Sequence, residues 1–194
     1  MRRLFLIIAL SLCLHSCFES NPPVPKPKTY FRMDIEEPIY KEFRESNYPY
    51  RFEYPDYGHI EKVKGDKDSR YWLNINFQDF GTKLYLSYKR IDSKTKLEYL
   101  VNDSYTFLKE HQKLSSGILE REYESRDKRV YGTAFEIKGN EIASPYQFYL
   151  TDSSTHFVRG AIYFDFKTNN DSISNIIERL IIDLENLISS FEWD

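Results

Sequence analysis

The sequence has only two cysteines, Cys13 and Cys17, and seven glycines among 194 residues. Both cysteines lie in the first seventeen residues, so the rest of the chain contains no pair for a disulfide and must be held together by burial of side chains. The scattered glycines form neither a Gly-x-Ser-x-Gly elbow nor a phosphate-binding loop. The sequence therefore argues against serine hydrolases and nucleotide-binding proteins.

Neither sign of charge dominates the chain, which has 27 basic and 30 acidic side chains and a formal charge of −3. This balance gives no electrostatic footprint for nucleic acid. Beyond the N-terminus, no apolar run approaches the roughly 18 residues needed to cross a bilayer. Aromatic residues are abundant, with 16 Tyr and 14 Phe, which is typical of strand-rich packing.

The N-terminus carries an export signal. Arg2 and Arg3 form a charged region, Leu4–Leu14 supply an apolar core, and the small residue Ser16 directly precedes Cys17. This is the bacterial lipoprotein pattern, in which Cys17 is the acylated residue. An ordinary cleaved signal peptide and an uncleaved anchor are the alternatives. We expect residues 1–16 to be removed and the acyl chains on Cys17 to attach the protein to a lipid bilayer, with roughly 0.8 kcal/mol from each buried methylene.

Cleavage before Cys17 removes 16 of the 194 residues, leaves 178, and changes the formal charge from −3 to −5 because Arg2 and Arg3 are lost. Residues 17–29 contain four prolines and little to bury, which predicts a lipidated, semi-rigid tether. A proline-rich docking ligand is the alternative interpretation. Residues 30–194 are of the right length for one domain with a substantial core.

The first half of this domain shows mainly the two-residue alternation of strands. Alternation from Tyr30 to Glu36 predicts a short strand or extended arm, and Tyr50–Tyr54 predicts a second strand. Residues 61–68 are predicted to be a charged loop. The segments Tyr71–Phe77 and Leu84–Tyr88, joined by a short turn, predict a hairpin.

The second half adds two helices. Ser93 is the predicted N-cap of a helix that ends near Lys113. The expected apolar face of this helix contains Leu97, Leu100, Val101, Leu108 and His111. Extended segments follow near residues 118–125, 129–138, 146–151 and 156–166, and their short turns imply antiparallel neighbours. Apolar residues at three- and four-residue steps from Ile173 to Phe191 predict the final helix.

This order of elements predicts an α+β fold, with an antiparallel sheet of six or seven strands and two main helices packed on it. The order of strands and final helix after residue 118 resembles the α-β-α sandwich of the Mog1 and PsbP type.

Few side chains form a pattern that points to chemistry. His59, His111 and His156 lack the spacing of zinc ligands, and Asp66-Lys67-Asp68-Ser69-Arg70 begins like a calcium loop but has Arg70 at a ligand position. Neither a metal nor a cofactor is expected. Asp34, Glu36 and Glu37 are interpreted as a solvated strand end. Asp171-Ser172-Ile173 resembles a bacterial O-glycosylation sequon, but a helix cap at Asp171 or Ser172 is the preferred interpretation.

Three residues are candidates for ligand binding. Trp72 could line an aromatic cleft for a sugar or lipid. His156 and Arg159 lie on one predicted strand, but their odd spacing places them on opposite faces.

Three stretches of the chain resemble the gliding motility-associated lipoprotein GldD family of Bacteroidetes-type bacteria. They are residues 25–34 (PKPKTYFRMD), 48–55 (YPYRFEYP) and 156–164 (HFVRGAIYF). The resemblance implies an envelope lipoprotein of the gliding machinery, which is linked to type IX secretion, with other envelope proteins as partners. In such lipoproteins an acidic run after the acylated cysteine resembles a surface-export tag. The absence of that run favours a periplasm-facing domain, on the outer membrane or, alternatively, the inner membrane.

We therefore expect a membrane-anchored, non-catalytic component of that machinery. The alternative is a periplasmic module that binds a glycan, peptidoglycan or lipid fragment. An enzyme ranks below both, because no acid–base pair is evident.

Overall fold

The computed structural model describes residues 35–65 and 69–194, except for the side chains of residues 110–112. All of these residues belong to one contact unit, Arg32–Asp194. The elements in chain order are β1 (Tyr40–Phe43), β2 (Tyr50–Pro55), β3 (His59–Lys62), β4 (Leu73–Phe77), η1 (Gln78–Phe80), β5 (Thr82–Arg90), α2 (Lys94–Gln112), β6 (Gly117–Ser125), β7 (Val130–Lys138), β8 (Tyr146–Thr151), β9 (His156–Phe164), α3 (Ser174–Ser190) and β10 (Glu192–Trp193).

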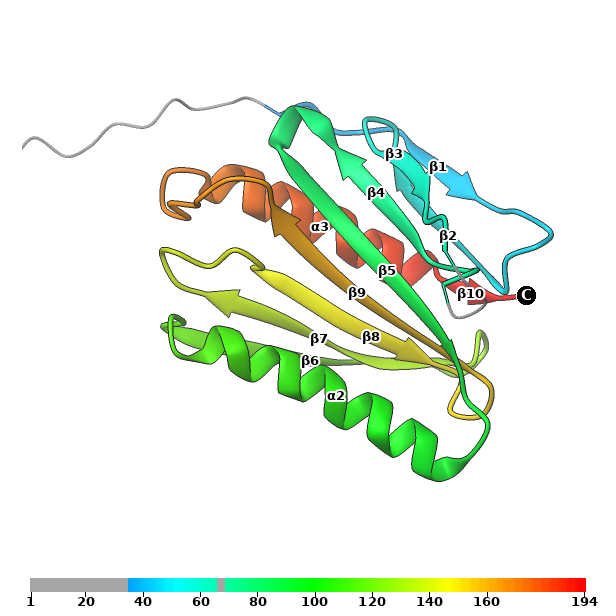
Figure 1. Ribbon diagram of the computed structural model, residues 1–194. Coiled ribbons are helices and arrows are strands. Elements are labelled where there is room, and N and C mark those ends of the chain that lie inside the picture. The colour runs from blue at the N-terminus through cyan, green and yellow to red at the C-terminus, as the bar shows by residue number, and fades with distance from the viewer. Residues whose placement is uncertain (1–34, 66–68) are drawn as a thin grey trace, which may run out of the picture. The chain divides into compact units, whose positions relative to one another are not determined.

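A seven-stranded antiparallel sheet is the centre of the domain (Figure 1). Its strand order is β3-β4-β5-β9-β8-β7-β6, so β9 inserts between the predicted hairpin β4–β5 and the strands β6–β8. Helix α2 packs on one face against β8 and β9. Helix α3 and a small sheet of order β1-β2-β10 cover the other face. This arrangement confirms the predicted α+β class, the sheet and both helices.

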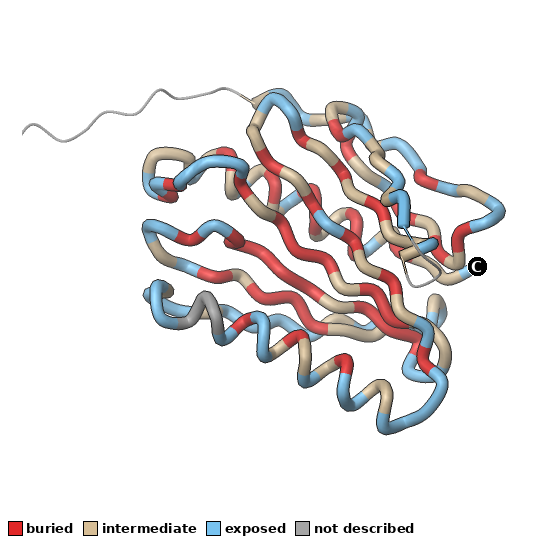
Figure 2. The backbone as a smooth tube through the Cα atoms, viewed as in Figure 1, coloured by how far each residue is buried: buried red, intermediate tan, exposed pale blue. Residues whose placement is uncertain are grey.

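The larger core lies between the central sheet and α3. Every second side chain of strands β5 and β9 enters this core. Figure 2 shows how much of the central strands is buried. Leu180, Leu184 and Leu187 face the sheet from α3, and each is 1% exposed. Because burying a Leu side chain contributes about 1.5–3 kcal/mol, this face of α3 is a major source of stability.

Helix α2 closes the smaller cores on the other face. Leu97, Leu100, Val101 and Leu108 pack there as the sequence predicts, against residues such as Phe157. The Ser93 hydroxyl accepts a hydrogen bond from the Lys96 backbone nitrogen at 3.2 Å, which confirms the predicted N-cap. The side chain of His111 lies outside the described residues.

Three short strands were not predicted from the sequence. Residues 35–39 are irregular, and the first strand begins at Tyr40, which pairs with Pro55 of β2. The remaining part of the strand expected from Tyr30 lies outside the described residues. The predicted loop 61–68 is wrong at its start, since Glu61 belongs to β3. The Glu61 carboxylate accepts hydrogen bonds from Lys83 Nζ at 2.8 Å and from the side chain of Asn76 in β4.

The predicted cap of α3 is also wrong. The helix begins at Ser174 after Ile173 at the N-cap position, and no side chain caps it.

Candidate functional site

A spacious cleft opens at one end of the central sheet, where β5 leads into α2 and β9 begins. It encloses about 650 Å³, within the range of roughly 300–1,000 Å³ that is usual for small-molecule sites. The described lining residues are Pro49, Tyr71, Tyr88, Lys89, Arg90, Asp92, Lys96, Thr155 and His156. We call this feature the β5–α2 cleft. Its walls come from parts of the chain that only the tertiary structure brings together.

The β5–α2 cleft is cationic. Lys89, Arg90 and Lys96 line it, whereas Asp92 is the single carboxylate among the described lining residues. None of the three cations forms an ion pair with a described residue. The first turn of α2 contains no acidic residue, although a helix N-terminus is normally stabilised by negative charge. An anionic group in the cleft would therefore gain from the side chains and from the helix dipole.

His156 contributes a neutral polar group to the cleft. Burial lowers its pKa, so the imidazole is uncharged at neutral pH, and burial raises the pKa of Tyr88. The Tyr88 hydroxyl keeps its proton and forms a hydrogen bond of 2.8 Å with His156 Nδ1. The His156 ring also stacks on Trp193, with ring centroids 5.2 Å apart. These contacts hold the imidazole in one orientation.

A tight turn fixes the start of β9 beside the cleft. Asp152 Oδ1 accepts hydrogen bonds from the backbone nitrogens of Ser154, Thr155 and His156 at 3.0, 2.7 and 2.8 Å. Burial raises the pKa of Asp152, but these hydrogen bonds outweigh burial and lower it to about 2. The carboxylate is thus a fixed structural anion. The register of β5 and β9 then sets Arg90 directly opposite His156.

The structure separates the three predicted binding residues. His156 lines the β5–α2 cleft, and Trp72 lies beside it, where Lys89 Nζ is 5.0 Å from the indole centroid. The indole nitrogen of Trp72 donates to the Tyr88 carbonyl at 2.9 Å, so its polar atom is used by the fold. Arg159 lies on the opposite face, as its odd spacing from His156 predicts. Its guanidinium is 4.0 Å from the Phe107 ring and donates to Gln147.

The cations that give the β5–α2 cleft its charge are not among the residues predicted from the sequence. Lys89, Arg90, Lys94 and Lys96 lie within eight consecutive positions of an otherwise acidic chain. This basic segment was the available signal. Its meaning depends on the corner between β5 and α2, which turns part of the segment toward β9.

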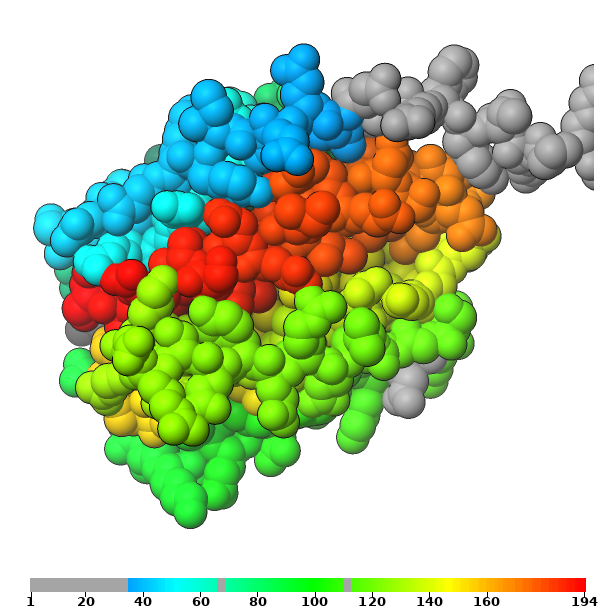
Figure 3. Space-filling view, turned by 180° about the vertical axis from the view of Figure 1, so that it is seen from behind, coloured from blue at the N-terminus to red at the C-terminus, as the bar shows by residue number. Residues whose placement is uncertain are grey.

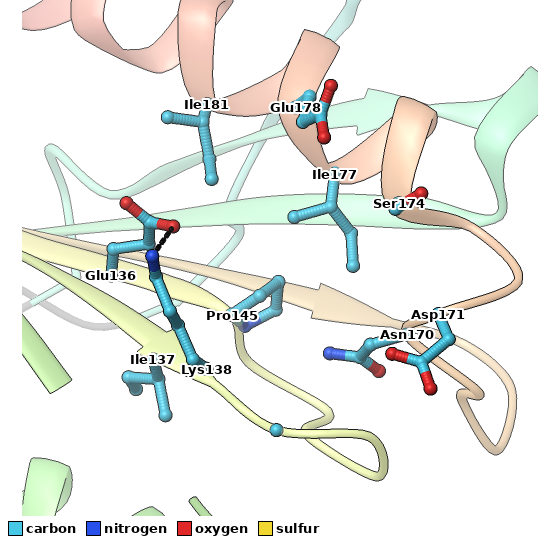
Figure 4. A pocket seen from close by; sticks show the side chains of 11 residues that line it. Glu136, Ile137, Lys138, Pro145, Asn170, Asp171, Ser174, Ile177, Glu178 and Ile181 are labelled. Carbon is cyan, nitrogen blue, oxygen red and sulfur yellow. Dashed lines mark ion pairs between the residues drawn. The ribbon is translucent and has the colours of Figure 1, made fainter. Parts of the chain in front are cut away.

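A second pocket lies between β7, β8 and the first half of α3 (Figure 4). Its volume is about 270 Å³, and Ile177 and Ile181 project into it opposite Pro145. Glu136 and Lys138 form an ion pair of 3.6 Å at its edge. Asn170 donates to the Ile142 carbonyl at 3.2 Å, while its own buried Oδ1 has no hydrogen-bond partner among the described residues. This pocket is smaller and more apolar than the β5–α2 cleft.

A buried ionic cluster joins α3 to the small sheet. The Asp183 carboxylate accepts hydrogen bonds from Arg179 of the preceding turn and from the hydroxyls of Tyr40 and Tyr57. The Asp183 side chain is fully buried, and Arg179 is 12% exposed. The cluster therefore links α3 to β1 through Tyr40 and to the turn after β2 through Tyr57.

Within residues 35–65 and 69–194, no three His, Cys, Asp or Glu side chains are grouped to hold a metal ion. The incomplete calcium motif at 66–70 falls mostly outside the described residues, as does Asp34. Within the described part of the chain, no helix is both long and apolar enough to span a membrane.

The described residues form an α+β sandwich with an open, cationic cleft. In overall structure it is similar to the solution structure of cyanobacterial PsbP (CyanoP) from Synechocystis sp. PCC 6803, with a TM-score of 0.49 and 12% sequence identity. That match covers 84% of this chain and 98% of the cyanobacterial one. The chain belongs to the gliding motility lipoprotein GldD family, whose model matches residues 20–193. No curated protein matches the sequence significantly.

Membership of this family confirms the resemblance seen in the three sequence stretches. The protein is a lipoprotein component of gliding motility, and the family places it in the cell envelope.

Proposed function

We propose that the protein is anchored to a membrane through acylated Cys17 and acts as a non-catalytic component of the gliding machinery, linked to type IX secretion. The observation that carries this proposal is the position of the family match, which begins at residue 20, three residues after the predicted acylated cysteine. The match to the family therefore begins almost directly after the lipoprotein pattern ends. Residues 17–29 then serve as the tether of a domain that starts at residue 30.

The contacts of the buried and half-buried acid–base groups support a non-catalytic role. Asp183 and Tyr57 hold α3 against the small sheet, and Asp152 holds the turn before β9. His156 is bonded to Tyr88 through one ring nitrogen. Each of these groups already stabilises the fold, which favours a scaffold that presents surfaces to other envelope proteins. We place the domain on the periplasmic side, on the outer membrane or alternatively the inner membrane.

The anchor can be tested with two matched cysteine variants in the full-length protein. Cys17→Ala should abolish incorporation of labelled palmitate, release the domain from the membrane fraction and impair gliding. Cys13→Ala is the control, because Cys13 lies in the segment that we expect to be removed, and it should change none of these readouts. Labelled, membrane-bound Cys17→Ala protein would overturn the anchor. Normal gliding by cells with released protein would overturn the link between anchor and function.

The charge of the β5–α2 cleft favours a second candidate function, the binding of an anionic glycan, peptidoglycan or lipid fragment. Replacement of Lys89 and Lys96 by Gln should weaken binding of a soluble muropeptide or of a short-chain phosphatidylglycerol in titration calorimetry. The control replaces Lys109 and Lys113, exposed lysines at the other end of α2, and removes the same charge. Equal effects of both pairs, or no binding of either probe by the wild type, would contradict this function.

A further inference from the structure

Strand β6 forms one edge of the central sheet, and no described strand pairs with its outer side. The strand is nine residues long and pairs with β7 without interruption from Gly117↔Lys138 to Ser125↔Val130. It contains no proline. A long, regular edge strand presents unpaired backbone N–H and C=O groups, which form a template for another strand. Edge strand β3 at the other side has only four residues.

One face of β6 carries a row of negative charge. Glu120, Glu122 and Glu124 alternate along the strand and are exposed. Their cross-strand partners on β7 are Phe135, Thr133 and Tyr131, so β7 supplies no cation to this row. Glu120 accepts a hydrogen bond from Tyr105 and Glu124 pairs with Arg126, but no described residue bonds to Glu122. Glu122, and Glu120 with its neutral hydroxyl partner, therefore remain available to a cation on the free side of the edge.

The other face of β6 borders α3. Leu119 and Tyr123 lie on this face, and Leu119 is 46% exposed. Arg121 pairs with Glu185 of α3 across a hollow of about 200 Å³. Figure 3 shows this side of the molecule, where α3 lies between strands β1 and β2 of the small sheet and the hairpin β6–β7. An added strand would thus meet glutamates on one face and the partly apolar rim beside α3 on the other.

We propose that the outer edge of β6 docks an extended, basic segment of a partner protein, which adds to the sheet as an eighth strand. Lysine or arginine residues at alternate positions lie opposite Glu120, Glu122 and Glu124, and the intervening apolar residues lie on the Leu119 side. Directly opposite residues of paired strands share a face, and opposite charges at such positions stabilise pairing. This inference names a partner surface that the membrane-anchor proposal does not require.

The same charges disfavour a second copy of this chain as the occupant. An antiparallel β6–β6 pair centred on Glu122 sets Glu122 against Glu122 and Glu120 against Glu124. Like charges that lie directly opposite destabilise a strand pair. The edge is therefore protected against self-association while it remains open to a basic strand.

The test uses the full-length protein in a neutral detergent and a fluorescent peptide as long as β6, in which lysine alternates with valine and threonine. A scrambled peptide of the same composition, with its lysines in one block, is the peptide control. The Glu122→Lys/Glu124→Lys variant should bind the alternating peptide roughly tenfold more weakly, since each cross-strand charge pair contributes 0.2–1 kcal/mol. The Glu36→Lys/Glu37→Lys variant changes the same charge at exposed positions and should bind like the wild type.

Amide hydrogen exchange on the wild-type protein distinguishes strand addition from simple charge attraction. The alternating peptide should slow exchange in β6 and leave the opposite edge strand, β3, unchanged. Equal binding of the two peptides, equal loss in both charge variants, or no slowing in β6 would overturn the proposal. Concentration-dependent dimers that bury β6 would also overturn it, because they would show that a second copy occupies the edge.

Discussion

Replacement of Asp183 by alanine tests the cluster that joins α3 to the small sheet. Asp183 Oδ1 accepts from the Tyr40 hydroxyl at 2.7 Å and from Arg179 Nε at 3.1 Å, and Oδ2 accepts from Tyr57. The variant leaves the Arg179 guanidinium, only 12% exposed, without its carboxylate. Removal of one partner of a buried pair typically costs about 3–5 kcal/mol. We expect the free energy of unfolding to fall by that amount.

The assay is urea unfolding followed by far-UV circular dichroism. With a slope of roughly 2 kcal/mol per molar urea, the midpoint of Asp183→Ala should fall by about 2 M. Glu185→Ala is the control on the same helix, because Glu185 forms an exposed ion pair with Arg121 whose expected contribution is about 0–1 kcal/mol. A combined Arg179→Met/Asp183→Leu variant should regain most of the stability, since it removes both charges.

A loss below about 1 kcal/mol in Asp183→Ala would refute the reasoning, because the cluster would then contribute no more than a surface ion pair. A loss in Glu185→Ala as large as in Asp183→Ala would refute it as well. That outcome would show that any change on α3, rather than an unpaired buried charge, destabilises the fold.

Three further predictions concern stability. Asp152 has a pKa of about 2 in the folded chain, below its ordinary value of 3.8, so it stabilises the fold above pH 4 by about 2 kcal/mol, and this stability is lost as the pH falls toward 2. Unfolding at several pH values should show a flatter acid dependence for Asp152→Asn. Burial raises the pKa of Tyr146 from 10.0 to about 12, so the stability that its protonated hydroxyl contributes is complete below pH 10 and is lost between pH 10 and 12. The free energy of unfolding of Tyr146→Phe should therefore fall less steeply with rising pH over that interval. In Gly132→Ala the new Cβ would lie 2.0 Å from a carbonyl oxygen of β8. We expect thermal unfolding to show a free energy of unfolding lower by about 3 kcal/mol. The control is Gly117→Ala, whose Cβ would have no atom within 4 Å and which should lose far less stability.

The long elements could be predicted because their signals are local. The periodicity of α3, the Ser93 cap of α2 and the alternation of β4 to β9 each depend on neighbouring residues in the sequence. Strands β1, β3 and β10 have four, four and two residues, too few to show a period. Their formation depends on partners elsewhere, as when Arg51 of β2 pairs with Glu192 of β10.

The candidate site was predictable only in part. His156 was recognised as polar on a strand, but its neighbours Lys89 and Arg90 were not assigned to the same site. They are 66 or more positions away in the chain, and the antiparallel register of β5 with β9 brings them together. The sequence predicts Trp72 as a residue that lines a cleft. In the structure Trp72 lies beside the β5–α2 cleft, and its indole nitrogen donates a hydrogen bond to the Tyr88 carbonyl.

The sequence by itself determined the α+β class and the two helices, and it indicated the lipoprotein pattern that ends at Cys17, because these features are written in consecutive residues. Only the tertiary structure decided that β9 lies between β5 and β8, that the basic segment at residues 89–96 borders His156, and that β6 ends the sheet with its glutamates unpaired by β7. The physical reason is that strand order and register are set by non-local backbone pairing and by burial of shared faces, which no local pattern specifies.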